Sequence, residues 1–417
     1  MSQAIATRPV RDILKWPVEG ITRVPLQVYI DPDLYKWEQD RIFRGPVWNY
    51  LGLEIEIPAS GDYITTRVGD TPVIVVRTDA GGVNALVNRC AHKGVTVCFQ
   101  NEGNSKTFTC PYHNWIYDHD GKLTTVPFER GVQNLGGMPP DFRREDHRLV
   151  PLRVETLNGL IFGTMSSQTP ALEKYFGEEM VAHVRRTLHG KLRVLGRYRQ
   201  VMHHNWKLYA ENARDNYHPS LLHGFFSTFK LNRLSAEGGV RQDRAGWHHV
   251  VFAKRLTDKD EGEYASGVIR AMKTNYGLQD PSLIDQWMEY ADSITNSIQC
   301  IFPGFVLQQI LNSIATRQLL PLGPDKCELV WTLLGFEGDT EEQTQVRVKQ
   351  GNLVGPAGLV SMEDGVIGEF VQRGIRGDLD GTAVLLMGGH EVAPAPTRAT
   401  ETSVRGFWRV YRELMNA

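Results

Sequence analysis

Two short cysteine–histidine pairs constrain this chain more than any other feature of its sequence. Cys90 and His92 stand two positions apart, and after seventeen further residues Cys110 and His113 stand three positions apart. The surrounding segments are rich in β-branched and aromatic residues and are punctuated by Gly, Asp and Pro. Each pair is therefore predicted to lie on a hairpin loop of a β domain, with one thiolate and one imidazole per loop.

Two thiolates and two imidazoles in this alternating order fit a Rieske [2Fe–2S] centre, in which two histidines replace two cysteines on one iron. Gly94 and Pro111, beside the ligands, suit tight turns that aim backbone N–H groups at the sulfurs. A structural zinc site is the alternative, but zinc fingers place a cysteine pair before a histidine pair. The remaining thiols, Cys98, Cys300 and Cys327, are predicted to be packing residues.

The residue pattern changes along the chain from strand-like to mixed helix and strand, which predicts an α+β protein. Residues 1–44 are expected to form an arm and a helix that pack on the catalytic domain, and 45–160 a small all-β domain for the cluster. Residues 161–417 mix helical spacing with two long predicted strands that meet at a Gly-Pro-Asp-Lys turn. They are expected to form the catalytic domain, an antiparallel sheet covered by helices.

Charge and hydrophobicity exclude some partners. The 417 residues include 46 Lys and Arg against 48 Asp and Glu, a net charge of −2. No global field would attract nucleic acid or an anionic membrane. There is no apolar run long enough to span a bilayer and no signal-peptide core, so we expect a cytoplasmic protein without nucleic-acid or membrane partners.

A second cluster of possible metal ligands lies in the Glu-Asn-x-x-Asp-x-Tyr-His-x₄-His block that ends at His223. His218 and His223 would lie about 140° apart on a regular helix, but Pro219 interrupts the helix and can bring both imidazoles to one side. Two histidines and one carboxylate with open positions are the ligands of mononuclear non-haem Fe(II) oxygenases. The residues alone leave the carboxylate open between Glu363 and Asp364.

The two centres have a coherent joint use. A Rieske cluster delivers electrons singly, and O₂ activation at a mononuclear iron consumes two. The chain resembles the large (alpha) subunit of the Rieske non-haem iron ring-hydroxylating oxygenases over nearly its whole length. By this resemblance, the iron ligands are His218, His223 and Asp364. Asp215 links a cluster histidine of one subunit to an iron histidine of the next, and Asn212 lies near the iron.

The resemblance also implies partners. The family works as a head-to-tail homotrimer, usually with a small beta subunit as α₃β₃. A separate NAD(P)H-dependent reductase is expected, because no G-x-G-x-x-G motif follows a strand here. The implied activity is the cis-dihydroxylation of an aromatic ring with O₂. A Rieske electron-transfer protein without oxygenase activity is the alternative from another class.

Arg317 stands in a stretch with the pattern of a core strand, where a substrate carboxylate would be a natural partner for it. Several segments resemble the terephthalate branch of the family and, less closely, the salicylate branch. In the terephthalate branch two arginines, here Arg317 and Arg398, hold two ring carboxylates, and Ile298 contacts the ring. We expect an aromatic carboxylate as substrate, with terephthalate favoured and a salicylate- or anthranilate-type acid as the alternative.

Overall fold

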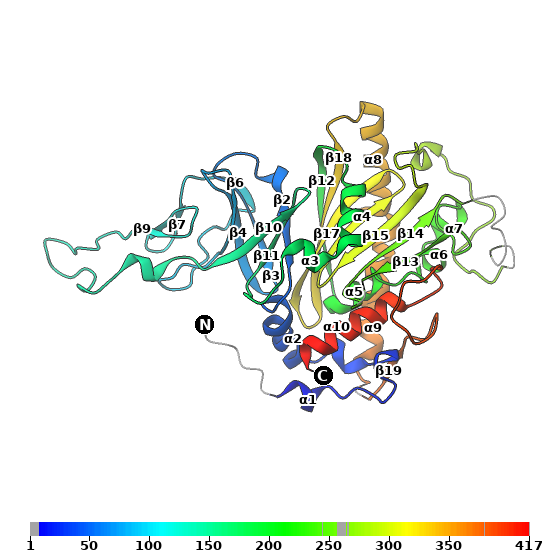
Figure 1. Ribbon diagram of the computed structural model, residues 1–417, viewed down its shortest axis with the longest axis horizontal. Coiled ribbons are helices and arrows are strands. Elements are labelled where there is room, and N and C mark those ends of the chain that lie inside the picture. Colours follow the sequence, from blue (N-terminus) through cyan, green and yellow to red (C-terminus); the bar gives the residue numbers. More distant parts are fainter. Residues whose placement is uncertain (1–7, 244, 257–263, 265–266, 379, 417) are drawn as a thin grey trace. The chain divides into compact units, whose positions relative to one another are not determined.

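The computed structural model describes residues 8–243, 245–256, 264, 267–378 and 380–416 (Figure 1). The chain divides into a small unit, Phe43–Leu172, and a large unit made of Met1–Ile42 and Glu173–Ala417. Helices and antiparallel sheets are both present, which confirms the expected α+β fold. Within the described residues, no helix combines the length and the apolar character needed to cross a bilayer.

The small unit is built from short antiparallel strands. Its seven-stranded sheet has the order β2 (Asn49–Leu53), β11 (Leu160–Thr164), β10 (Pro151–Leu157), β5 (Val83–Val87), β4 (Thr71–Arg77), β3 (Asp62–Val68) and β6 (Glu102–Asn104). A second sheet has the order β7 (Phe108–Thr109), β8 (Ile116–Tyr117) and β9 (Leu123–Thr125). The turn before β9 forms because Asp118 Oδ1 accepts the backbone N–H groups of Asp120 and Lys122, and Gly121 adopts φ +79°.

The large unit contains a second seven-stranded antiparallel sheet. Its order is β12 (Leu192–Met202), β18 (Lys326–Phe336), β17 (Ser313–Gly323), β16 (Phe305–Ile310), β15 (Ile294–Ile301), β14 (His248–Lys254) and β13 (Gly238–Gln242). β1 (Arg23–Pro25) and β19 (Thr382–Val384) form a separate two-stranded sheet. β16 is buried along its whole length, as expected of a strand covered on both faces.

The sequence predicts one long strand where the structure has three. The run that includes β15, β16 and β17 is interrupted at Phe302–Gly304 and again at Leu311, which has φ +54°. Because both faces of these strands are buried, their apolar residues do not alternate, and short signals alone, Pro303-Gly304 and Asn312, mark the two turns in the sequence.

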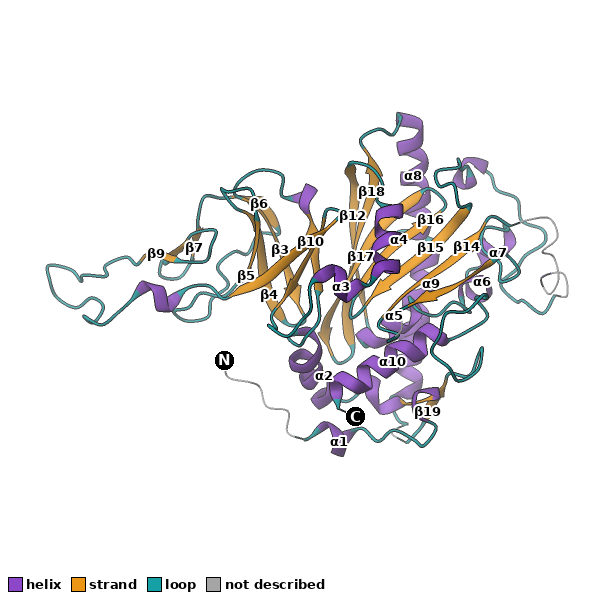
Figure 2. Ribbon diagram, viewed as in Figure 1, coloured by secondary structure: helices purple, strands orange, loops and turns teal. Residues whose placement is uncertain are grey.

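Helices cover both faces of this sheet. In Figure 2, α4 lies on the near face and α9 on the far face. Gln299 donates to Met180 O of α4, and a Cβ at Gly351 of α8 would touch Leu333 of β18. The helices are α1 (Val10–Ile13), α2 (Pro32–Glu38), α3 (Leu172–Phe176), α4 (Glu178–Thr187), α5 (Trp206–Asn212), α6 (Pro219–Leu222), α7 (Gly224–Thr228), α8 (Glu341–Val354), α9 (Leu359–Ile375) and α10 (Thr402–Met415).

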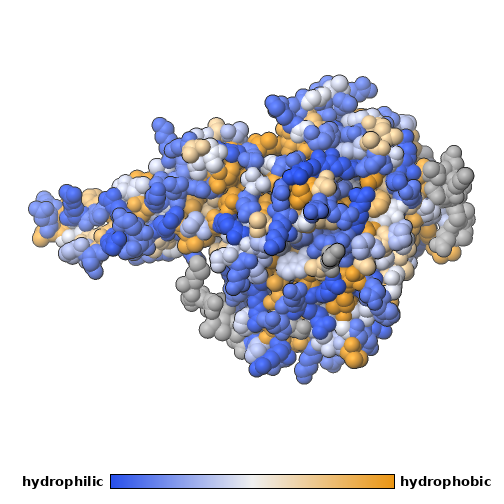
Figure 3. Space-filling model, viewed as in Figure 1, coloured by the Kyte–Doolittle hydropathy of each residue, from blue (hydrophilic) through white to orange (hydrophobic). Residues whose placement is uncertain are grey.

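Hydrophilic residues predominate on the face of the molecule drawn in Figure 3, and hydrophobic residues are scattered among them. Charge is also present in the interior of the large unit. Glu38 of α2 is fully buried, and its carboxylate accepts from Lys207 Nζ at 2.5 Å, Trp206 Nε1 at 2.7 Å and Tyr411 Oη at 2.7 Å. This network joins α2, α5 and α10, and it supports the helix that leads into the predicted iron site.

Replacing Lys207 with Met should destabilise the large unit by about 3–5 kcal/mol, because Glu38 would remain buried without a counter-ion. The exposed pair Arg185–Glu173 is the matched control, and Arg185→Met should cost less than about 1 kcal/mol. Urea unfolding followed by tryptophan fluorescence measures both. Equal, small effects would show that the buried pair does not hold these helices together.

Candidate functional site

The two loops predicted to hold the cluster have the same backbone geometry. The backbone N–H of Cys90 donates to Val95 O, and the carbonyl oxygen of Cys90 accepts from Gly94 N. Cys110 repeats both hydrogen bonds with the residues five and four positions further on, Trp115 and Asn114. The residue at the fourth position is left-handed in each loop, with φ +74° for Gly94 and +53° for Asn114.

These loops place the four predicted cluster ligands in two pairs. Cys90 and Cys110 are free thiols buried in one hydrophobic cluster, and Tyr117 Oη lies 3.2 Å from Cys90 Sγ. The rings of His92 and His113 lie side by side nearer the surface, with centroids 4.6 Å apart. Two inner thiols and two outer imidazoles are a donor set that suits a [2Fe–2S] centre with one Cys-ligated and one His-ligated iron.

The other three cysteines were predicted to be packing residues. Cys98, Cys300 and Cys327 are also buried thiols without a disulfide, and Cys98 lies in the same hydrophobic cluster as Cys90 and Cys110. Burial raises the pKa of Cys300, and that of Cys327 well above its usual range. Buried thiols outside a metal site pack as small apolar side chains.

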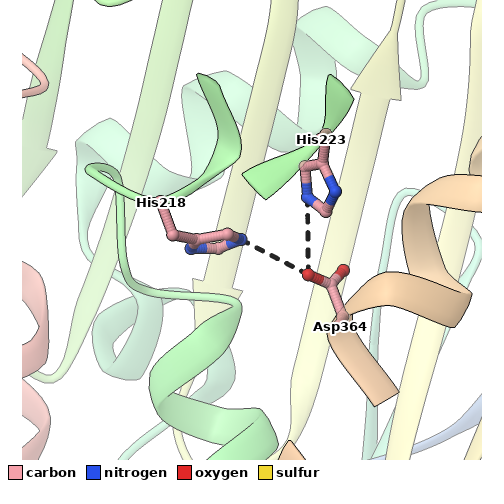
Figure 4. Close-up of side chains that lie close together, drawn as sticks. All are labelled: His218, His223 and Asp364. Atoms are coloured by element: carbon pink, nitrogen blue, oxygen red, sulfur yellow. Dashed lines mark ion pairs between the residues drawn. The ribbon is translucent and has the colours of Figure 1, made fainter. Parts of the chain in front are cut away.

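The predicted iron histidines flank a single helical turn. α6 begins at Pro219, directly after His218, and ends before His223, whose backbone is extended with ψ 91°. The chain then restarts as α7 at Gly224. This break rotates the second imidazole, so that both rings face the same point, with centroids 5.4 Å apart (Figure 4).

α9 brings the carboxylate to that point. Asp364 Oδ1 lies 3.4 Å from His218 Nε2 and 3.4 Å from His223 Nε2, and one ligand atom from each of the three residues lies within 4.8 Å of the others. Asn212 Nδ2 donates to the same oxygen at 3.0 Å. Burial alone would raise the pKa of Asp364, but the two histidines and Asn212 lower it to about 2. The donors thus fit a divalent cation with open positions.

Two further carboxylates stand behind the histidines. Asp215 Oδ2 lies 3.5 Å from His218 Nδ1, while its other oxygen accepts the backbone N–H groups of Tyr217 and His218. Glu363 Oε2 lies 2.7 Å from His223 Nδ1. The sequence offered Glu363 as a possible iron ligand, but in the structure it reaches the far side of His223 instead. In the sequence, the only sign of this role for Glu363 is that it stands next to Asp364.

A cavity opens beside these residues. It holds about 640 Å³ of non-atom space, part of it open to solvent. Its lining includes His218, His223 and Asp364 together with Ile298, Arg317 and Arg398, the three residues predicted to contact substrate. Ile298 is paired with Val251 across the sheet, and both line the cavity from the same face.

Arg317 is held on the sheet face by aromatic residues. Its cross-strand partner is Trp331, and the guanidinium carbon lies 4.1 Å from the centre of the Trp331 ring. Arg317 Nη1 donates to Tyr209 Oη at 2.8 Å, and its buried Nε has no hydrogen-bond partner.

Arg398 approaches from the loop before α10. Its two terminal nitrogens donate to Asn232 Oδ1 and Arg233 O, and its buried Nε has no partner. A Cβ at Gly238 would lie 2.3 Å from Phe252 O and 3.1 Å from that Nε, so glycine is needed there mainly because of the neighbouring strand. Burial lowers the pKa of Arg398 to about 10. In the part of the chain that the structure describes, neither Arg317 nor Arg398 has a carboxylate partner.

Two polar residues of the cavity were missed by the sequence analysis. Asn232 fixes Arg398 through its side-chain oxygen, and Asn296 donates to Leu231 O at 3.0 Å while its buried Oδ1 is unpartnered. Neither belongs to a motif. Their positions follow only from the register of the strands and the path of a distant loop.

Comparisons with known proteins agree with this geometry. Residues 47–136 match the Rieske [2Fe-2S] domain, and residues 186–417 match the catalytic domain of the ring-hydroxylating alpha subunit. The terephthalate 1,2-dioxygenase terminal oxygenase component subunit alpha 2 of a Comamonas species is 49% identical, over 97% of this chain and 98% of that protein. The anthranilate 1,2-dioxygenase large subunit of Burkholderia cepacia is 42% identical over 98% and 97%.

A third relative is the large oxygenase component of salicylate 5-hydroxylase from a Ralstonia species, 40% identical over 96% of each chain. Among solved structures, naphthalene 1,2-dioxygenase of a Rhodococcus species has a TM-score of 0.78 at 22% identity, over 99% of this chain and 98% of that one, which shows a shared fold. The catalytic-domain match excludes a protein that only carries electrons. The chain belongs to the ring-hydroxylating dioxygenases, as an alpha subunit with a Rieske [2Fe–2S] domain and a catalytic domain that binds mononuclear non-haem iron.

Proposed function

We propose that this chain is the oxygenase component of an O₂- and NAD(P)H-dependent dioxygenase that cis-dihydroxylates terephthalate. The observation that supports this substrate is the pair of buried arginines, Arg317 and Arg398, which line one cavity without carboxylate partners. Burying a guanidinium is costly unless it is paired. Two such groups in one cavity with apolar neighbours favour a flat acid with two carboxylates.

The proposed division of labour follows the geometry. His92 and His113 with Cys90 and Cys110 hold the cluster, and the site ligands His218, His223 and Asp364 hold the iron. When bound, the cluster supplies single electrons and the iron activates O₂.

The cavity residues would select and orient the substrate. Arg317 and Arg398 each bind one carboxylate, and Ile298 packs on the ring between them. Fixing both ends leaves the ring little freedom to rotate, so its orientation decides which carbons face the iron ligands. Asn212 holds the Asp364 carboxylate in place through its 3.0 Å hydrogen bond.

One observation favours the alternative, a salicylate- or anthranilate-type mono-acid. Each terminal nitrogen of Arg398 already donates to a protein acceptor, Asn232 Oδ1 or Arg233 O, which fits a residue that holds the loop in place. In that case Arg398 would be structural, and Arg317 alone would hold the single carboxylate.

The assembly is part of the proposal. Relatives are named as subunits of multicomponent oxygenases, and we propose a homotrimer, with or without a small beta subunit, that receives electrons from a separate reductase. Asp215 would then connect His218 to a cluster histidine of a second copy. Support comes from α9, whose outer face exposes apolar side chains at helical spacing: Leu359, Met362, Val366, Ile367, Phe370 and Val371.

Iron content tests the two centres separately. The purified protein should carry about three irons per chain, two in the cluster and one mononuclear. Asp364→Ala should lower this to about two and keep the red-brown absorption of the cluster, whereas Cys110→Ser should lose the cluster. If Asp364→Ala retains about three irons per chain, the proposed ligand set is wrong.

Substrate kinetics test the two arginines. Arg398→Ala should raise the KM for terephthalate by roughly 10–100-fold, because one carboxylate loses a charged hydrogen-bond partner, and should leave benzoate turnover unchanged. Arg409→Ala removes a half-buried arginine of α10 that donates to Ala245 O, and as the control it should leave the KM for both substrates unchanged. An unchanged KM for terephthalate, with salicylate or anthranilate as better substrates, would favour the mono-acid alternative.

The proposed contact through the outer face of α9 can be tested by introducing a charge there. Phe370, 55% exposed, should be covered in the assembly, so Phe370→Asp should yield smaller particles in light scattering after gel filtration. Val18, 98% exposed, is the control, and Val18→Asp should leave the particle mass unchanged. A native particle mass for Phe370→Asp would rule this face out as the contact.

A further inference from the structure

Glu363 and Asp364 are neighbours on α9 that approach the same histidine from opposite sides. Asp364 Oδ1 lies 3.4 Å from His223 Nε2, and Glu363 Oε2 lies 2.7 Å from His223 Nδ1. The Asp364 and His223 side chains are 7% and 3% exposed, whereas Glu363 is 30% exposed. The shorter acid therefore points to the buried centre, and the longer acid reaches around the ring to its outer nitrogen.

This contact distinguishes the two nitrogens of His223. At 2.7 Å, the Glu363 carboxylate accepts a hydrogen bond, so the hydrogen of a metal-bound ring would lie on Nδ1. Nε2 faces the Asp364 oxygen at 3.4 Å, on the side where the cation would bind.

The orientation of the ring depends on the same contact. His223 follows a break in the helix, where its backbone is extended, and its N–H donates to Pro219 O at 3.1 Å. Around the imidazole lie the His218 and Phe226 rings, 5.4 and 5.7 Å away between centroids, and the Asp364 and Glu363 carboxylates. Asp364 faces Nε2, and Glu363 is the group that contacts Nδ1.

We propose that Glu363 is a positioning residue for the iron site, which sets the tautomer and the ring orientation of His223. This inference rests on the proposed ligand set of His218, His223 and Asp364. α9 then supplies both a ligand and the group that aims another ligand. Carboxylates behind metal-bound histidines raise their basicity, and their loss costs 10–100-fold in metal affinity or activity in other proteins.

The test is metal binding by full-length protein with an intact cluster, after removal of the mononuclear iron. Fe(II) is titrated back to give its Kd, and Co(II) in the same site gives a visible ligand-field spectrum. Glu363→Ala should raise the Kd for Fe(II) by about 10–100-fold and alter the Co(II) spectrum. Glu363→Gln keeps an acceptor for Nδ1–H and should recover much of the affinity. Glu363→Asp, one methylene shorter, should behave like Glu363→Ala.

Two variants of α9 separate the possible failures. Glu369 pairs with Arg373 on the surface of the same helix, so Glu369→Ala should bind Fe(II) as the wild type does. Asp364→Ala should bind Fe(II) far more weakly than any other variant. If Asp364→Ala binds normally, the ligand set itself is wrong. If Asp364→Ala binds weakly but the Glu363 variants keep wild-type affinity and spectrum, the positioning role is refuted and the ligand set stands. The same conclusion follows if Glu369→Ala weakens Fe(II) binding as much as Glu363→Ala does.

Discussion

Three electron-rich atoms converge on one buried point in the large unit, and much of the structure around them serves that convergence. Asp364 Oδ1 lies 3.4 Å from the Nε2 atoms of both His218 and His223, and Asn212 Nδ2 donates to the same oxygen. A cation bound among these atoms would offset the cost of burying the carboxylate. The catalytic domain of this family binds mononuclear non-haem iron, and these three residues are its proposed ligands.

Within the described residues, the buried arginines Arg317 and Arg398 also lack partners of opposite charge, and the proposed substrate would provide them. A net charge of −2 gives the protein no long-range attraction for an anion, so the proposed selectivity for a carboxylate would have to arise inside the cavity. Arg317, over the Trp331 ring, and Arg398, hydrogen-bonded to Asn232 and Arg233, are both held by protein contacts. Charges held in place before binding lose little entropy when a ligand arrives.

Local sequence patterns predict the candidate metal ligands more completely than they predict the fold. The four cluster residues and the two histidines beside Pro219 stand in short motifs, because loops and helix breaks are specified locally. The choice between Glu363 and Asp364 was not local, since it depends on how α9 rotates against His223, 140 positions away. The three strands β15, β16 and β17 were merged in the sequence analysis because both of their faces are buried. The roles of Asn232 and Asn296 depend on loop and strand positions that no motif records.

The most direct measurement is anomalous X-ray diffraction at the iron absorption edge from crystals of the purified protein. The account predicts one peak enclosed by His218, His223 and Asp364, with Glu363 on the far side of His223. It also predicts a pair of peaks between the loops of Cys90 and Cys110. A peak at neither place, or a mononuclear peak bound by Glu363 in place of Asp364, would contradict it.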